Sequence, residues 1–167
     1  MSKCEFCEIS EQNRNVLFSD ETLVVAVKET SLHPGQITIF SKKHFTILEM
    51  VPEKVLGSCA KMANKVGIAA FESLQAQGSN ILIMNGLGAG QTVPHFSIEV
   101  IPRQEDDKLN LQWEAKQLME DEMEITTSLL KKEMENLAKE KPKQVADGVE
   151  IVDNKNNPLL KSLRRIP

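Results

Sequence analysis

The sequence contains no long apolar run, and its first residues are polar. A membrane-spanning helix needs about 20 consecutive apolar residues, and no apolar stretch in this chain of 167 residues approaches that length. The amino terminus, Met1-Ser2-Lys3-Cys4, lacks the apolar core of a secretory signal. We therefore expect no membrane association and a cytoplasmic protein.

Basic residues are not in excess either. The chain has 20 Lys and Arg against 24 Asp and Glu, which gives a formal net charge of −4. Proteins that bind nucleic acid regardless of its sequence need a basic surface, so this composition argues against a nucleic-acid partner. With 41% hydrophobic residues, the chain is long enough for one well-buried domain.

Cysteine is scarce, and three cysteines do not make a disulfide framework. Cys4 and Cys7 form a C-x2-C pair, and in a reducing compartment this spacing favours metal binding over a disulfide. The same pair is also compatible with two incidental thiols. Cys59 lies within a predicted helix and is most simply a small core residue.

Periodicity and turn residues predict mixed secondary structure in the first two-thirds of the chain. We expect strands at 15–19, 22–27, 37–40 and 80–85, a helix at 52–76 and a glycine-rich loop at 86–90. Glu, Lys, Leu and Met then dominate 109–139, which predicts a long amphipathic helix followed by a tail with a weak strand and a basic end. The predicted divisions are 1–105, 106–141 and 142–167.

The most informative segment runs from Gln91 to Arg103. Read as a strand, it alternates with period two, and three side chains therefore share one face: His95, Ser97 and Glu99. The intervening side chains, Phe96, Ile98 and Val100, are expected to enter the core.

This segment resembles the signature of the histidine-triad (HIT) family of nucleotide hydrolases and transferases, in which three histidines alternate with apolar residues after a Gln-Ser/Thr turn. Only the first histidine is present here, because Ser97 and Glu99 occupy the second and third positions. The resemblance covers about residues 4–105. It implies an α+β HIT-like domain with a five-stranded antiparallel sheet and a helix packed on it, extended here by the long C-terminal helix.

The resemblance also implies a structural metal site. Some members of the family bind zinc through an amino-terminal C-x2-C, a histidine after the third strand and the first histidine of the triad. The matching residues are Cys4, Cys7, His44 and His95. Two thiolates and two imidazoles suit tetrahedral Zn²⁺ with no open position for catalysis.

The catalytic positions depart from the family pattern. In active members the middle histidine attacks the α-phosphate, whereas a serine hydroxyl at that place is a poor nucleophile without a base. Ser97 and Glu99 are therefore the degenerate catalytic candidates, and Glu99 would also repel an incoming phosphate. Gln36 follows Pro34-Gly35 where the family often has histidine.

Several positions that contact ribose and phosphate in the family are retained. A glycine-rich turn offers backbone N–H donors to an anion, although its simpler interpretation is a tight connection between strands. Lys28 stands where the family has an acidic residue that binds the ribose hydroxyls, so that contact is lost and a positive charge gained. The candidate nucleotide-binding residues are Lys28, Asn85, Gly90, Gln91, Thr92 and Ser97.

The resemblance further implies a twofold homodimer, since in many HIT proteins the long helix and the strand before the signature pair across the axis. The predicted helix at 52–76 and the apolar run 81–84 fit that arrangement. The helix at 109–139 either contacts another subunit or protein, or folds back over its own domain.

These observations leave three interpretations of function. The favoured one is a non-catalytic module that binds a nucleotide or related phosphate, or regulates, without the usual nucleophilic histidine. The second is an active nucleotide hydrolase or nucleotidyl transferase with altered chemistry at Ser97 and Glu99, aided by His33 from a neighbouring loop. The third is a structural protein that interacts through its long helix.

Overall fold

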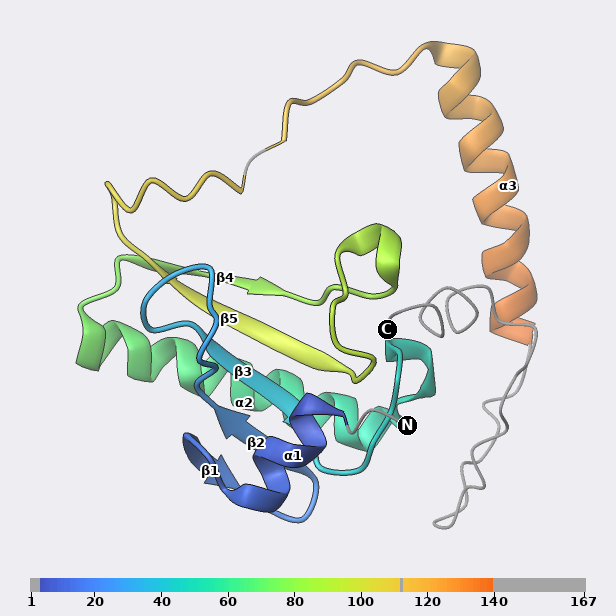
Figure 1. The fold of residues 1–167 in the computed structure, drawn as a ribbon. Coiled ribbons are helices and arrows are strands. Elements are labelled where there is room, and N and C mark those ends of the chain that lie inside the picture. The colour runs from blue at the N-terminus through green and yellow to red at the C-terminus, as the bar shows by residue number, and fades with distance from the viewer. Residues whose placement is uncertain (1–3, 112, 140–167) are drawn as a thin grey trace. The chain divides into compact units, whose positions relative to one another are not determined.

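The computed structural model describes residues 4–111 and 113–139. Its centre is a five-stranded antiparallel sheet with the strand order β1-β2-β3-β5-β4 (Figure 1). The predicted α+β fold is confirmed. The strands are β1 (Val16–Ser19), β2 (Leu23–Ala26), β3 (Ile37–Ser41), β4 (Gly78–Leu82) and β5 (Ser97–Arg103).

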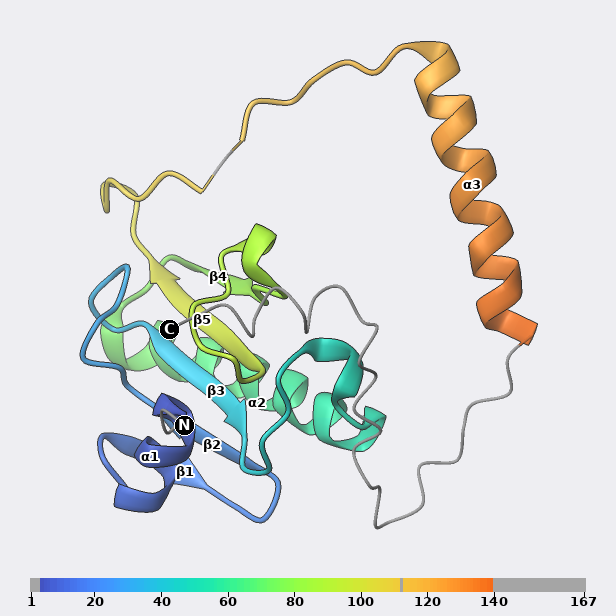
Figure 2. The same ribbon diagram turned by 45° about the vertical axis from the view of Figure 1, so that its right-hand side comes forward.

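A helix covers each face of this sheet. The long helix α2 (Glu53–Leu74) lies behind the strands in Figures 1 and 2, and α1 (Glu5–Gln12) lies on the near side. Short 3-10 turns, η1 (Leu48–Met50) and η2 (Leu87–Ala89), lead into α2 and towards β5. Helix α1 was not predicted from the sequence.

Apolar side chains alternate between the two faces of the sheet along the strands. They form two separate apolar clusters, one on each face. The cluster under α2 includes Phe96, Ile98 and Val100, as predicted for the apolar positions of the signature. The cluster under α1 stacks the ring of Phe6 on that of Phe40, with centroids 4.8 Å apart. On β5 the polar side chain of Glu99 is buried, and that of Ser97 is half-buried.

The signature segment is only partly a strand. β5 begins at Ser97, and the residues from Gln91 to Phe96 form a loop. Pro94 lacks the N–H group that a ladder needs, and the His95 N–H donates locally to the Val93 carbonyl at 2.7 Å. The strand predicted at 80–85 likewise ends earlier, at Leu82.

The predicted helix at 109–139 begins only at Glu120, as α3 (Glu120–Lys139). The prediction of a helix is wrong for 109–111 and 113–119. The apolar residues Leu109, Leu111 and Trp113 recur there with period two rather than 3.6, which does not favour a helix. Helix α3 starts where acidic residues favour a helix N-terminus, and the Met119 N–H donates to Glu122 Oε2 at 3.0 Å.

Residues 4–108 form one compact unit, and the described residues from 109 onward belong to a second. In the second unit every residue of α3 is exposed, including Met123, Leu130 and Leu137. Within the described residues no helix is long and apolar enough to cross a membrane. The weak strand and basic end predicted for 142–167 lie outside the described residues.

Candidate functional site

The structure brings the four predicted metal ligands together. One ligand atom from each of Cys4, Cys7, His44 and His95 lies within 4.8 Å of the other three. Cys4 Sγ is 3.4 Å from His95 Nδ1, and Cys7 Sγ is 3.5 Å from His44 Nδ1 and 3.7 Å from His95 Nδ1. The fold thus brings together residues that are up to 91 positions apart in the sequence.

Each ligand is positioned by a different part of the fold. Cys4 is the N-cap residue of α1 and Cys7 lies in its first turn, so the spacing of three places both thiols at the same end of the helix. His44 lies in the loop three residues after the end of β3, and His95 lies two residues before the start of β5. Helix α1 is held in place because Phe6 packs edge-on against His95.

The hydrogen bonds of His95 orient its ring. Its Nε2 donates to the Ser41 carbonyl oxygen at 2.8 Å, and the side chain is only 1% exposed. A ring protonated on Nε2 keeps a lone pair on Nδ1, which is the nitrogen that faces the cysteines. The exposed His44 also directs Nδ1 to the cluster, while its Nε2 lies 3.5 Å from Thr46 Oγ1.

The two thiols of the cluster differ in acidity. Burial by itself raises the pKa of Cys4, but hydrogen bonds with His44, His95 and the backbone outweigh burial and lower this pKa to about 5. Burial and the adjacent negative Cys4 raise the pKa of Cys7 to about 11. One of the two cysteines is therefore readily present as a thiolate. The other loses its proton only when a bound cation balances the second negative charge.

The geometry fits a tetrahedral ion. Ligands bound to one Zn²⁺ at about 2.0–2.3 Å lie roughly 3.3–3.8 Å apart in a tetrahedron. Three of the sulfur–nitrogen distances, 3.4, 3.5 and 3.7 Å, fall in this range, and all four ligand atoms lie within 4.8 Å of one another. An ion held by all four side chains would have no coordination position left for a reacting water.

A separate cavity of about 320 Å³ lies beside the signature strand. It is lined by Phe6, Lys28, Thr30, Ser31, Leu32, Gln36, Met84, Gly90, Gln91, Thr92, Val93, Ser97 and Glu99. Five of the six predicted nucleotide-binding residues are in this set. No histidine is among the described residues that line it, and His33, whose Nδ1 bonds to the Pro34 carbonyl oxygen at 2.7 Å, is not one of them.

Glu99 is buried at this cavity and accepts three hydrogen bonds from its neighbours. Its Oε2 accepts hydrogen bonds from Gln36 Nε2 at 2.8 Å and Thr38 Oγ1 at 2.7 Å, and its Oε1 accepts one from Ser97 Oγ at 3.3 Å. Thr38 stands directly opposite Glu99 in the β3–β5 register. The carboxylate is thus held by donors on two strands and one loop.

The remaining predicted residues have mainly local partners. Lys28 places its Nζ 5.2 Å from the centroid of the Phe6 ring, a cation–π contact at the cavity. Gln91 ties the loop together, because its Oε1 accepts from Gly86 N–H and its Nε2 donates to the carbonyls of Thr46 and Val93.

Asn85 alone among the predicted nucleotide-binding residues does not line the cavity. Its Oδ1 accepts from the Leu48 N–H at 3.0 Å, and its Nδ2 donates to both carboxylate oxygens of Glu49. These contacts hold the η1 turn against the segment after β4.

Comparison with known proteins places this geometry in a family. The model of the HIT domain matches residues 10–106, which contain every lining residue of the cavity except Phe6, together with His44 and His95 of the cluster. The chain belongs to the HIT family. The match extends over the segment that the sequence resemblance identified as the signature, Gln91 to Arg103.

Individual HIT relatives share this core. The adenylylsulfatase HINT3 of Arabidopsis thaliana is 34% identical over 64% of this chain, but the match spans only 55% of that protein. An uncharacterised HIT-like protein of Methanocaldococcus jannaschii is 30% identical over 62% of this chain and 81% of its own length. The crystal structure of a zinc-bound histidine-triad protein from Mycobacterium smegmatis superposes with a TM-score of 0.61 at 27% identity, covering 81% of this chain and 96% of that one.

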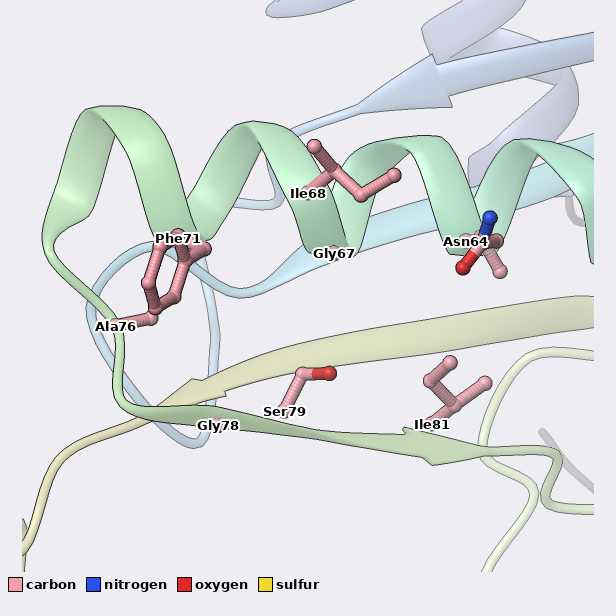
Figure 3. A pocket seen from close by; sticks show the side chains of 9 residues that line it. Asn64, Gly67, Ile68, Phe71, Ala76, Gly78, Ser79 and Ile81 are labelled. Atoms are coloured by element: carbon pink, nitrogen blue, oxygen red, sulfur yellow. The ribbon is translucent and has the colours of Figure 1, made fainter.

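A third feature of the HIT domain is an apolar groove between α2 and β4. Figure 3 shows Phe71 of α2 and Ile81 of β4 on either side of it. Phe71 is 66% exposed and Ile81 is 50% exposed, and β4 is an edge strand of the sheet. Large exposed apolar side chains beside an unpaired edge are typical of an interaction surface.

Sequence reasoning missed both buried partners of Glu99, which are Gln36 in the lining of the cavity and Thr38 on the neighbouring strand β3. Gln36 was noted only as a departure from the family pattern. Alternation along β3 puts Thr38 on one face and the apolar Ile37 and Ile39 on the other. A polar residue within so apolar a strand was the one available signal that this face meets a polar group.

Proposed function

We propose that this HIT protein is a binding or regulatory module for a nucleotide or a closely related ligand, and that it does not use the family's covalent histidine chemistry. The contact between Ser97 and Glu99 within the cavity carries this proposal. These two residues stand at the second and third triad positions of the family pattern. In active members the imidazole at the second position attacks the α-phosphate and the one at the third supports it.

The chemistry of these two side chains supports the proposal. Imidazole is nucleophilic near neutral pH and departs readily once phosphorylated, whereas a serine would form a stable phosphoester. The Ser97 hydroxyl donates to Glu99 over 3.3 Å, and Glu99 already accepts two shorter hydrogen bonds. Three donors therefore already contact this carboxylate, and the contact from Ser97 is the longest of them.

We propose that the Cys4-Cys7-His44-His95 cluster binds a structural zinc ion. The donor set, the 3.4–3.7 Å spacings and the orientation of His95 by Ser41 support this assignment. Zinc would supply a cross-link between the start of α1 and the base of β5, and it would leave the cavity chemistry to other residues. We also expect the protein to be cytoplasmic, where such thiols stay reduced.

We further propose that the α2–β4 face forms a homodimer. Members of the HIT family are often dimers, and twofold dimers are the commonest oligomers in general. The exposed side chains of Ile68, Phe71 and Ile81 would be covered in such an assembly, and β4 would gain a neighbouring strand.

Two measurements on the zinc-loaded protein test the proposed function. Calorimetric titration with AMP, ADP, GMP and the parent nucleosides should show binding of at least one ligand, with competition by the others. Turnover of adenosine phosphoramidate and dinucleoside polyphosphates should stay near the uncatalysed rate. Absence of binding by the whole panel would overturn the module, and rapid release of AMP would overturn the lack of catalysis.

The Ser97–Glu99 hydrogen bond favours one second candidate, a hydrolase or transferase in which Glu99 assists Ser97. If wild-type turnover is found, Ser97→Ala separates the two. This candidate requires that turnover falls by at least about 100-fold in the variant, the usual scale for loss of a catalytic group.

A further inference from the structure

The hydrogen-bond directions around Glu99 fix what its carboxylate offers to a ligand. The Gln36 carboxamide is oriented by Leu32, whose backbone N–H donates to Gln36 Oε1 at 2.8 Å. Its NH₂ group must therefore be the end that meets Glu99 Oε2 at 2.8 Å. With Thr38 and Ser97 also donating, Glu99 acts only as an acceptor. About four acceptor positions exist on a carboxylate, so one remains, on Oε1.

Ser97 presents the same polarity. Its single hydroxyl proton points to Glu99, so only the oxygen lone pairs are available to a ligand. Glu99 is 3% exposed, and Ser97 is half-buried at the cavity surface. This end of the cavity consequently offers acceptors and no donor from either side chain.

The charge balance of the cavity adds to this polarity. Lys28 and Glu99 are the only charged residues among its described lining, so the lining is neutral overall. The Lys28 ammonium group is also engaged with the face of the Phe6 ring. A phosphate monoester, which carries only acceptor oxygens when fully ionised, would meet a carboxylate with no excess positive charge to offset it.

We infer that this cavity selects an uncharged nucleoside-type ligand over the corresponding nucleoside monophosphate, with a hydroxyl of the ligand donating to the Ser97–Glu99 acceptors. This inference rests on the proposed function. In that proposal the ligand lies with its 5′ end, which carries the phosphate in a nucleotide, beside Ser97 and Glu99. The neighbouring apolar lining, Leu32, Met84 and Val93, suits the flat face of a base.

The test compares three ligands on the wild-type protein: adenosine, 5′-deoxyadenosine and AMP. Adenosine should bind at least tenfold more tightly than AMP, because of charge, and several-fold more tightly than 5′-deoxyadenosine, because of the lost donor. Equal or tighter binding of AMP overturns the inference and leaves the proposed function standing. Absence of binding by every nucleoside and nucleotide overturns both.

Two variants locate the effect. Glu99→Gln removes the charge and adds an NH₂ donor, and it should reduce the preference for adenosine over AMP by at least tenfold. Glu53→Gln removes an exposed carboxylate in the first turn of α2 and should leave the preference unchanged. Zinc content and thermal unfolding confirm that each variant is folded. If Glu99→Gln does not fold, the three-ligand comparison on the wild type still decides.

Discussion

His95 donates from Nε2 to the backbone carbonyl oxygen of Ser41 over 2.8 Å. This bond fixes the protonated nitrogen of a buried ring and turns the other nitrogen towards two thiols. The His95 side chain is therefore part of the cysteine–histidine cluster and does not line the cavity. No imidazole is found among the described residues that line this cavity.

The first prediction concerns metal content. Wild-type protein should contain one zinc ion per chain, and Cys4→Ser or Cys7→Ser should lower the content below about a tenth of this value. If zinc contributes about 3 kcal/mol, the melting temperature should fall by roughly 10 °C in a chain of this size. Plasma emission spectroscopy and calorimetry measure the two quantities.

Cys59→Ala provides the matched control for this experiment. Cys59 is a free, fully buried cysteine in the cluster under α2 and is not one of the four clustered Cys and His residues. The variant should keep its full zinc content even if its packing is slightly weakened. Equal zinc loss in all three variants would show that unfolding, rather than a missing ligand, releases the metal.

The second prediction concerns protons displaced by zinc. At pH 7 the pKa of about 5 leaves Cys4 as a thiolate, and the pKa of about 11 leaves Cys7 protonated. Zinc binding should therefore release about one thiol proton at pH 7 and approach two below pH 5, so acid weakens the affinity more steeply there. Calorimetric titration in buffers of different ionisation enthalpy counts these protons. Release of two thiol protons at pH 7 would contradict the assigned order.

Local periodicity explains how much of the fold could be predicted from the sequence. Period two in β5 and period 3.6 in α2 both reflect which residues one element buries, and the structure confirms both elements to within a few residues except for the loop before Ser97. Helix α1 has eight residues and only two buried side chains, Phe6 and Ile9. So short a helix depends on tertiary packing against Phe40, which no local pattern reveals.

The candidate site was likewise predictable from the sequence only in part. The family resemblance supplied the four ligands that the structure brings together, because their types and positions were visible in the sequence. The environment of Glu99 was not visible. Its contact with Thr38 follows from the register between two strands about 60 residues apart, and its contact with Gln36 from the conformation of a loop. Neither is encoded in local spacing.

The third prediction concerns the β1–β2 turn. Asp20 Oδ1 accepts hydrogen bonds from Thr22 N–H and Oγ1, both at 2.7 Å, and from Leu23 N–H at 2.9 Å. Asp20→Ala should lower the free energy of unfolding by about 1 kcal/mol at pH 7. Denaturant titration measures this loss. Glu21→Ala, one residue along and exposed, should change stability by less than about 0.5 kcal/mol.

The effect of Asp20 should also depend on pH with a defined sign. Slight burial raises the pKa of Asp20, but hydrogen bonds from Leu23 and Thr22 outweigh it and hold the pKa below the usual value of 3.8. A lowered folded-state pKa stabilises the protein above 3.8, and this contribution is lost as pH falls through the folded-state value. The difference between wild type and Asp20→Ala should therefore shrink below pH 3.8. A difference that grows in acid would contradict this assignment.

The fourth prediction concerns assembly. Ile81 is half exposed on the edge strand β4, beside the α2 side chains Ile68 and Phe71. Ile81→Asp should convert a dimer to a monomer in light-scattering measurements, because a carboxylate on the paired face would lie opposite its symmetry copy and lose hydration on association. Leu17→Asp is the matched control, since Leu17 is 60% exposed on β1 at the opposite edge of the sheet. It should remain dimeric. A monomeric wild type, or dissociation by the β1 substitution alone, would move the interface away from the α2–β4 face.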